Sequence, residues 1–169
     1  MKNLFGKGQS SDERELGLLE HVPVFEGFSR GEIVELEKVM HRREHKAGDV
    51  LAYKGSAGHG MYVILSGSVA VMGEEGRQLA ELGPGEIFGE LSLLDDSPRS
   101  ATVVAKADCV TLGLFRHDMQ KLIQAAPRLG AALAMKLAAI VAVRLRKAND
   151  RIEELEKELM VVDKRCGEA

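Results

Sequence analysis

Residues 48 to 115 consist of short runs rich in β-branched and aromatic residues, separated by glycines at turn spacing. The runs read VLAY, MYVILS, SVAVM, ATVVAKA and CVTLGLF, with glycines at 55, 58, 60, 67, 73, 76, 83 and 85. Glycine supplies the positive φ angles that tight connections and barrel corners need. The pattern predicts an antiparallel β domain closed into a roll or jelly-roll barrel.

Helical patterns flank this region on both sides. Apolar residues recur at helical spacing before it, and Ser29 with Glu32 has the spacing of a capping box, which predicts a helix from Arg30 to about His41. After residue 116 the helical period returns, and Pro127 separates a short helix from a long one. The predicted fold class is therefore α+β: a β-roll between N-terminal helices and a long C-terminal helix.

The second half of the long helix keeps apolar residues on one narrow stripe. Their 3-4 spacing begins at Val141 and continues through Leu145, Ala148, Ile152, Leu155, Leu159, Val162 and Cys166. This is the seam of a coiled coil, so we expect a parallel homodimer along residues 141 to 166. The alternative is that Cys166 is a surface thiol on a disordered tail.

Charge and composition exclude several classes of protein. Lys+Arg at 23 against Asp+Glu at 26 give a net charge of −3, so we expect no direct DNA binding. The start has no signal-peptide pattern, and residues 129 to 143 are fewer than the roughly 20 that a bilayer needs and include Lys136. With two cysteines far apart, these features favour a cytoplasmic protein without a membrane partner.

The segment GPGEIFGELSLLDDSPRSATVVA, residues 83 to 105, combines groups that suit an anion. Gly89 permits close backbone approach, and one helical turn after it would offer amides near Glu90, Leu91 and Ser92. Arg99 supplies a planar fork for two phosphate oxygens, and Glu90 is an acceptor for a hydroxyl. The alternative is that Glu90 and Arg99 pair on the surface and Gly89 serves only a turn.

This segment resembles the phosphate-binding cassette of the cyclic nucleotide-binding domain family, which includes cAMP receptor-type transcription factors, protein kinase regulatory subunits and gated ion channels. The resemblance runs from about Leu18 to Asn149 and implies a division into a mobile segment 1–15, a cyclic nucleotide-binding domain 16–149 and a dimerisation helix 141–169. It implies that Arg99 holds the phosphate and Glu90 the ribose hydroxyl. The turn KGSAGHGMY departs from the family pattern, with Ser56 and His59 where Asp is common, and we expect His59 to be an exposed loop residue.

Two further positions concern whether the ligand carries adenine or guanine. At the position of Ser100, kinase subunits of the family that are specific for cAMP often have Ala, and cGMP-responsive members often have Thr. The cAMP receptor-type factors have Ser there. Ser100 therefore leans mildly towards cAMP over cGMP. The segment RLRKAND resembles the part of the family's long helix that meets the base, where Asn149 can pair with an adenine edge. The alternative is that Asn149 is a solvated flank of the coiled coil.

Signals for catalysis and for metal binding are weak. HRREH, residues 41 to 45, has the spacing of an inverted zinc-protease motif, but Gly48 and its neighbours would end the helix that such a site needs. His21 and His117 have no partners at ligand spacing, so the sequence predicts no metal site. No recognisable catalytic signature is present, and Cys109 is expected in the core, so we do not expect an enzyme.

The resemblance implies a homodimeric cyclic nucleotide sensor, a regulatory module that signals by repositioning its C-terminal helix. Transcription factors of the family follow this helix with a DNA-reading domain, whereas this sequence stops at Ala169, which implies an unknown protein effector in trans. A constitutive coiled-coil scaffold with an empty roll is the alternative. A DNA-binding regulator is a third reading, which the charge balance disfavours.

Overall fold

A computed structural model describes residues 9–95 and 97–167, and the side chains of residues 9–12, 14 and 161–167 lie outside what it describes. The N-terminal helices are α1 (Gln9–Leu19), the short 3-10 helix η1 (Pro23–Phe25) and α2 (Arg30–Glu37). The helix α1 begins inside the segment 1–15 for which we predicted mobility, and the division of the chain into three parts stays a prediction.

The strands of the β-roll fill residues 41 to 115, interrupted by η2 (Glu74–Gly76) and α3 (Leu91–Leu94). They are β1 (His41–His45), β2 (Val50–Ala52), β3 (Gly60–Ser66), β4 (Val69–Met72), β5 (Gln78–Leu82), β6 (Ile87–Phe88), β7 (Thr102–Ala105) and β8 (Cys109–Phe115). They form two four-stranded antiparallel sheets, in the orders β1-β8-β3-β6 and β2-β7-β4-β5. The predicted antiparallel roll is therefore confirmed.

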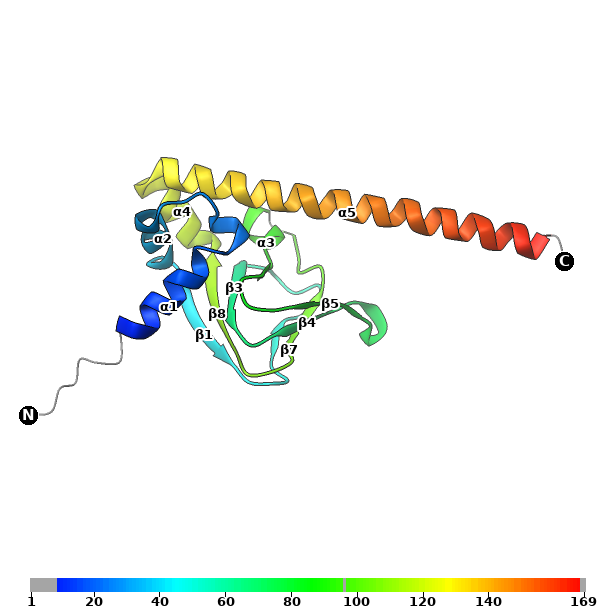
Figure 1. The fold of residues 1–169 in the computed structure, drawn as a ribbon, viewed down its shortest axis with the longest axis horizontal. Helices are drawn as coiled ribbons and strands as arrows, with labels where there is room; N and C mark the ends of the chain where they lie inside the picture. Colours follow the sequence, from blue (N-terminus) through cyan, green and yellow to red (C-terminus); the bar gives the residue numbers. More distant parts are fainter. Residues whose placement is uncertain (1–8, 96, 168–169) are drawn as a thin grey trace, which may run out of the picture.

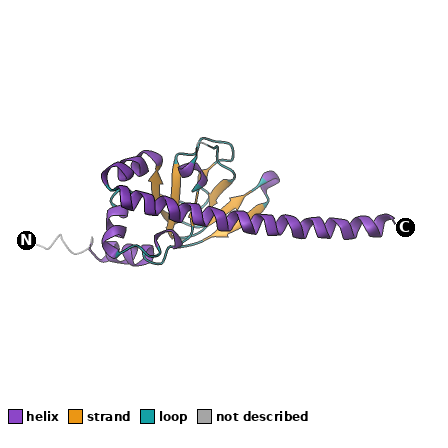
Figure 2. Ribbon diagram, turned by 90° about the horizontal axis from the view of Figure 1, so that it is seen from above, coloured by secondary structure: helices purple, strands orange, loops and turns teal. Residues whose placement is uncertain are grey.

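Two helices follow the roll, α4 (Arg116–Ala125) and α5 (Pro127–Gly167). Pro127 is the first residue of α5, where its missing N–H costs no hydrogen bond, as the sequence pattern predicted. Figure 1 shows α5 lying along one side of the roll and then projecting well beyond it, and Figure 2 shows the same arrangement from above. The long C-terminal helix is confirmed, whereas the coiled coil and the dimer stay predictions.

The hydrophobic core has two parts, one on each face of the first sheet. Side chains alternate between the faces along β3: Met61 and Val63 pack against the helices, while Tyr62 and Ile64 pack between the two sheets. The part under the helices includes buried residues of α5, among them Leu133 and Leu137. The first half of α5 is therefore fixed to the roll by apolar packing.

One predicted boundary was wrong. The capping box of Ser29 and Glu32 is present, but α2 ends at Glu37 instead of continuing to about His41. The amides of Val39 and Met40 donate to carbonyls three residues back, which tightens the chain into a turn. Residues from His41 then pair with β8, and this strand pairing replaces the expected last helical turn.

Candidate functional site

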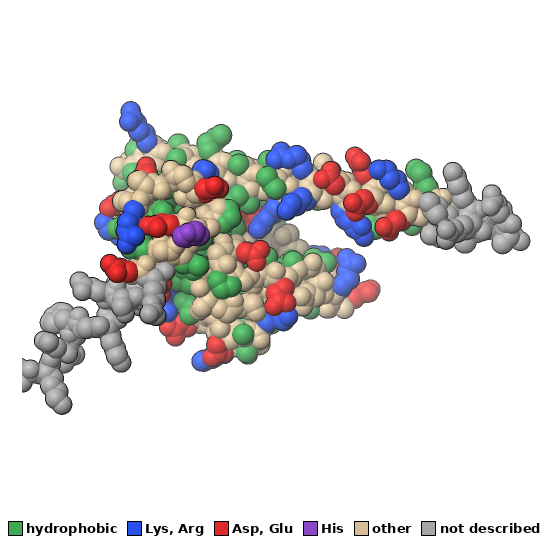
Figure 3. Space-filling view, in the orientation of Figure 1, with side chains coloured by type: hydrophobic (Ala, Val, Ile, Leu, Met, Phe, Trp, Pro, Cys, Tyr) green, Lys and Arg blue, Asp and Glu red, His purple; other side chains and the backbone are tan. Residues whose placement is uncertain are grey.

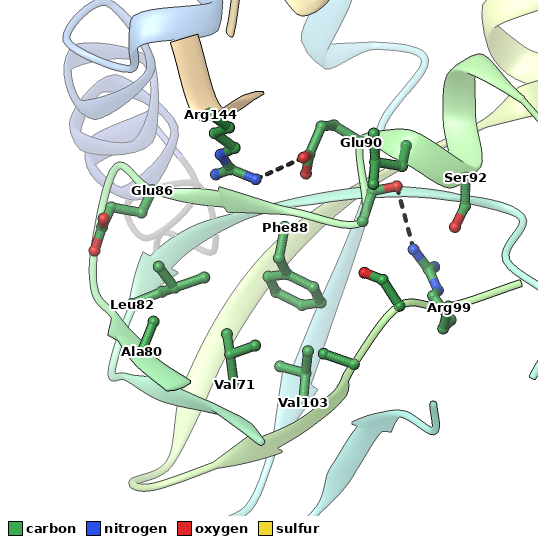
Figure 4. Close-up of a pocket in the computed structure, with 14 residues that line it drawn as sticks. Val71, Ala80, Leu82, Glu86, Phe88, Glu90, Ser92, Arg99, Val103 and Arg144 are labelled. Carbon is green, nitrogen blue, oxygen red and sulfur yellow. Dashed lines mark hydrogen bonds and ion pairs between the residues drawn. The ribbon is translucent and has the colours of Figure 1, made fainter. Parts of the chain in front are cut away.

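A cavity of about 360 Å³ lies between the second sheet, α3 and α5. Its volume is within the range of small-molecule sites. Apolar side chains from the strands line one part of it, namely Val71, Ala80, Leu82, Phe88 and Val103. Figure 4 shows these side chains grouped together, with Arg144 and Glu90 on one side and Arg99 on another. The cavity therefore combines an apolar wall with charged groups.

The residues predicted for the site come together here, with one exception. Those that line the cavity are Gly89, Glu90, Leu91, Ser92, Arg99 and Ser100. Asn149 does not line it and is exposed on α5. The placement of the six agrees with one shared site, while the ligand contacts of all seven stay predictions.

Gly89 lies where a side chain would collide. Its φ is +78°, and a Cβ there would be 2.1 Å from Arg99 Nη1 and 2.9 Å from the Gly60 carbonyl oxygen. A non-glycine residue would therefore meet both the steric cost of the left-handed conformation and a direct clash. The close approach of the backbone to Arg99 thus depends on glycine.

Arg99 is half-buried and is held through its backbone as well as its side chain. Its amide donates to the Ser56 carbonyl, and its own carbonyl accepts from the Gly55 amide, both at 2.8 Å. Its Nη1 donates to the Gly89 carbonyl at 3.2 Å. Burial lowers the pKa of the guanidinium from its ordinary value, and Tyr62 and Glu90 oppose this, but arginine stays charged in proteins. Arg99 is a fixed cation at the cavity.

Glu90 is almost fully buried, with 4% of its surface exposed. Arg144 of α5 reaches across to it, and Arg144 Nη1 donates to Glu90 Oε1 at 2.6 Å (Figure 4). Arg144 Nη2 also donates to the Ile87 carbonyl at 2.9 Å. A buried carboxylate needs such a partner because desolvation of an unpaired charge is costly. Since a carboxylate has two oxygens with several acceptor positions, this contact leaves Glu90 capacity for another donor.

The short helix α3 links the cavity to α4. The amides of Leu93 and Leu94 donate to the Glu90 carbonyl. The amides before Leu93 in this turn come too early in the helix to donate to a carbonyl within it, as at any helix start. Arg116, the first residue of α4, donates from Nη2 to the carbonyl of Ser92 at 2.6 Å and to that of Asp95. One guanidinium therefore joins the end of α3 to the start of α4.

Sequence reasoning missed Arg144 and the apolar wall. It singled out RLRKAND, which includes Arg144, but chose Asn149 as the residue that meets the ligand. Five positions along a helix turn a side chain by about 140°, so these two residues lie on different faces of α5. Only the packing of α5 on the roll decides which face meets the cavity.

Other sequence predictions have clear outcomes. HRREH forms the strand β1, so it cannot present ligands as a zinc-protease helix would. Cys109 is 2% exposed and lies in the core between the sheets, as predicted. His59 is an exposed loop residue. Among the helices of residues 9–95 and 97–167, none is long and apolar enough to cross a bilayer.

Known proteins are similar to this chain in sequence and in fold. Residues 42–126, half of the chain, match the family described as "Cyclic nucleotide-binding domain". The "Cyclic AMP receptor protein" of Thermus thermophilus is 39% identical over 137 residues, which are 79% of this chain and 62% of that protein. The chain thus spans less than two thirds of that relative's length.

Solved structures agree with the sequence match. The crystal structure of the Thermus thermophilus catabolite activator protein aligns with a TM-score of 0.72 at 39% identity, over 79% of this chain and 63% of that one. A cyclic nucleotide-binding domain from Methylobacillus flagellatus aligns with a TM-score of 0.74 at 29% identity, over 88% of this chain and 85% of that one. With half of its residues matched and the same roll and helices, this chain belongs to the cyclic nucleotide-binding domain family.

Proposed function

We propose that the cavity binds a cyclic nucleotide, with cAMP preferred over cGMP, and that the chain works as a homodimeric regulatory module without enzymatic activity. The observation that carries the proposal is the combination, in one cavity, of the half-buried cation Arg99 and the buried carboxylate Glu90. A cyclic nucleotide is a singly charged phosphodiester fused to a ribose with one free hydroxyl. Its two polar ends require a cation and an acceptor, respectively.

The surroundings of these two residues suit the rest of such a ligand. The amides at the start of α3 are donors for phosphate oxygens, next to the Arg99 guanidinium. The apolar side chains of Val71, Leu82 and Val103 offer a surface for the flat face of a base or ribose. Two arginines, Arg99 and Arg144, are among the described residues that line the cavity. Arg144 is already paired with the Glu90 carboxylate, whereas the Arg99 side chain donates to a backbone carbonyl, so one positive charge is left to balance a ligand. A singly charged, partly apolar ligand therefore fits this cavity better than a highly charged one.

Two contacts offer a route from the cavity to the helices. Arg144 ties α5 to Glu90, and Arg116 ties α4 to the end of α3. A ligand that changes the position of Glu90 or α3 would change the balance between arrangements of α4 and α5. The size of such a shift is limited by the ligand's differential affinity for the two arrangements, about 1.4 kcal/mol for each tenfold difference.

The proposed dimer rests on the projecting half of α5. Its large apolar side chains are exposed at the positions of the predicted seam, with Leu145 60%, Ile152 55%, Leu155 42% and Leu159 65% exposed. Single exposed leucines are common, but a regular stripe along a projecting helix favours a partner helix. A second copy of the chain supplies the same stripe, and it would pair with the first in parallel along residues 141 to 166.

The proposed preference for cAMP rests on Ser100 and Asn149. Ser100 is exposed and lines the cavity beside Arg99, whereas Asn149 is on an exposed face of α5. Asn149 would contribute by pairing its side-chain amide with an adenine edge, which requires its face of α5 to meet the base. We expect competition binding to rank cAMP above cGMP, and a tenfold preference for cGMP would contradict this part of the proposal.

We also propose that the chain acts in the cytoplasm, that it signals to a separate effector protein, and that it does not bind DNA directly. The visible face in Figure 3 carries acidic and basic side chains side by side along α5, without a broad basic area. DNA-binding surfaces concentrate Lys and Arg on one face. A gel shift of the chain with duplex DNA at low salt should therefore fail.

Thermal unfolding with and without nucleotide tests the main proposal against a constitutive dimerisation scaffold. A ligand at about a hundred times its dissociation constant adds about 2.7 kcal/mol of stability, which raises Tm by several degrees. We expect this shift with cAMP, a smaller one with cGMP at equal concentration, and little with linear 5′-AMP, whose phosphate carries more charge. No shift with either cyclic nucleotide would favour the scaffold.

A further inference from the structure

Two histidines and one aspartate meet where β1 lies beside the start of α4, outside the residues that line the nucleotide cavity. His41 Nε2 is 2.9 Å from Asp118 Oδ2, and His117 Nε2 is 2.9 Å from Asp118 Oδ1. Each side chain offers one possible ligand atom, and these three atoms lie within 4.8 Å of one another. The carboxylate is thus bracketed by two imidazoles.

Strand pairing builds this cluster from residues far apart in the sequence. His41 is the first residue of β1 and lies opposite Gly113 of β8. β8 ends at Phe115, so that His117 and Asp118 follow in the first turn of α4. The Phe115 ring contacts both imidazoles, with ring centroids 5.4 Å from His41 and 6.2 Å from His117. One aromatic side chain therefore supports both rings beside the carboxylate.

Burial differs within the cluster in a way that suits an ion entering from water. The Asp118 side chain is only 10% exposed, whereas His41 is 51% and His117 62% exposed. Asp118 is in the first turn of α4, where the helix dipole favours a negative charge. The carboxylate is fixed, and the imidazoles form the solvent side of the cluster and have room to move.

We propose that His41, His117 and Asp118 bind one divalent transition-metal ion of the Zn²⁺ class. Two imidazole nitrogens and one carboxylate oxygen are donors that Zn²⁺, Co²⁺ and Ni²⁺ accept, whereas Mg²⁺ and Ca²⁺ favour oxygen ligands alone. Three protein ligands leave a fourth tetrahedral position for water, on the exposed side. The sequence alone disfavoured a metal site for two reasons: the HRREH segment that includes His41 would not continue as a helix past Gly48, and His117 has no partner at ligand spacing along the chain.

The rearrangement needed for binding is small. Ligand atoms around a tetrahedral ion at about 2.1 Å lie roughly 3.4 Å from one another. The three atoms already lie within 4.8 Å, so rotation of the two half-exposed imidazoles brings them into range. For the ion to take the Nε2 lone pairs, each ring gives up the Nε2 proton that now faces Asp118: a neutral ring moves it through solvent to Nδ1, and a doubly protonated ring releases it to water. Metal coordination then replaces the present contacts with Asp118.

A bound ion would join two parts of the chain that are 77 residues apart in sequence. It would link β1 to the same turn of α4 in which Arg116 holds the end of α3. Because an ion that binds only the folded chain stabilises it, metal should raise Tm. This consequence does not depend on whether the cavity holds a nucleotide.

The test uses the full chain without an affinity tag, carrying Cys166→Ser so that no terminal thiol competes for the ion. Calorimetric titration with ZnCl₂ should find one ion per chain, and CoCl₂ should give the visible absorption of tetrahedral Co²⁺. His41→Gln and His117→Gln keep a side-chain amide that can donate to Asp118. Each should weaken Zn²⁺ at least about tenfold, since even losing a residue outside the ligand shell costs that much.

His21→Gln is the matched control, because His21 is an exposed histidine that lies beside Pro84 and Ile140 and is not part of the cluster, so its loss should leave Zn²⁺ affinity unchanged. MgCl₂ should not bind. No saturable binding at millimolar Zn²⁺ would overturn the proposal and leave the three residues as a hydrogen-bonded cluster only. Undiminished binding in both His41→Gln and His117→Gln would overturn it as well, because the ion would then be held elsewhere.

Discussion

Arg144 of the long helix donates to the buried carboxylate of Glu90 at 2.6 Å, although the two residues are 54 positions apart in sequence. Glu90 belongs to the segment proposed to bind the ribose, and Arg144 lies just before the projecting half of α5. The contact therefore connects the cavity to the proposed dimer helix. It also compensates a charge that the fold has removed from water.

Replacing Arg144 should cost more stability than replacing its partner. Arg144→Ala leaves Glu90 buried without its cation and should lower the free energy of unfolding by about 1 to 3 kcal/mol, less than for a fully buried pair because Arg144 is 44% exposed. Glu90→Gln removes the buried charge itself and should cost less. Urea unfolding of both variants and of the double variant gives the coupling. Equal losses in the two single variants, with no coupling, would contradict a role for this pair in stability.

Arg99→Ala should weaken cAMP binding about ten- to a hundredfold while the fold stays intact. A charge-assisted contact to phosphate contributes roughly 1.5 to 3 kcal/mol, and the backbone of residue 99 keeps its own hydrogen bonds to residues 55 and 56. Arg99→Lys keeps the charge but loses the planar fork, so its loss should be intermediate. Calorimetry checks the affinities, and an unchanged dissociation constant for Arg99→Ala would refute the site.

Two glycines separate backbone strain from steric clash. Gly89 and Gly85 both have positive φ, +78° and +85°, but a Cβ on Gly85 meets nothing within 4 Å, whereas one on Gly89 meets Arg99 and Gly60. Gly85→Ala should cost about 1 kcal/mol of stability and leave nucleotide affinity unchanged. Gly89→Ala should cost more and also weaken binding by displacing Arg99. Matching affinities in the two variants would count against the close approach at Gly89.

The parallel dimer predicts a specific crosslink. Cys166 follows Val162 as the last position of the predicted seam. Parallel packing would place the Cys166 thiols of the two chains opposite each other across the dimer axis, whereas antiparallel packing would place them at opposite ends of the coiled coil. The Cys166 side chain lies outside what the structure describes. Mild oxidation should give a dimer on a non-reducing gel, lost in Cys166→Ser and kept in Cys109→Ser, whose thiol is buried. A monomer by light scattering at micromolar concentration would rule the dimer out.

Stability should fall as pH is lowered through the range in which His45 titrates. Burial lowers the pKa of the His45 imidazole from its ordinary value; Asp49 opposes this and Arg43 adds to it. The unfolded chain, with a pKa of about 6.5, then binds the proton more readily than the folded chain. This contribution is full above about pH 6.5 and is lost as pH falls towards the lower folded pKa.

His45→Gln should therefore reduce the slope of unfolding free energy against pH just below pH 6.5. Urea unfolding at several pH values measures this slope. Parallel curves for the parent and His45→Gln would show that His45 does not contribute.

Local features of the sequence determined the β-roll, the helix break at Pro127 and the capping box at Ser29, because each depends on residues close together in the chain. That residues between Gly89 and Ser100 lie together at one cavity was also predictable, since they fall in one short segment around α3, while their contacts with a ligand stay predictions. The end of α2 was not, because pairing of β1 with β8 decides it.

Contacts between distant segments were settled only by the tertiary structure. Whether Arg144 or Asn149 faces the cavity depends on the rotation of α5 about its axis, which the apolar packing of Leu133 and Leu137 on the roll determines. The meeting of His41 with His117 and Asp118 depends on the register of β1 against β8, which sets residues 77 positions apart side by side. Periodicity predicts which face of an element is apolar, but only packing determines what that face meets.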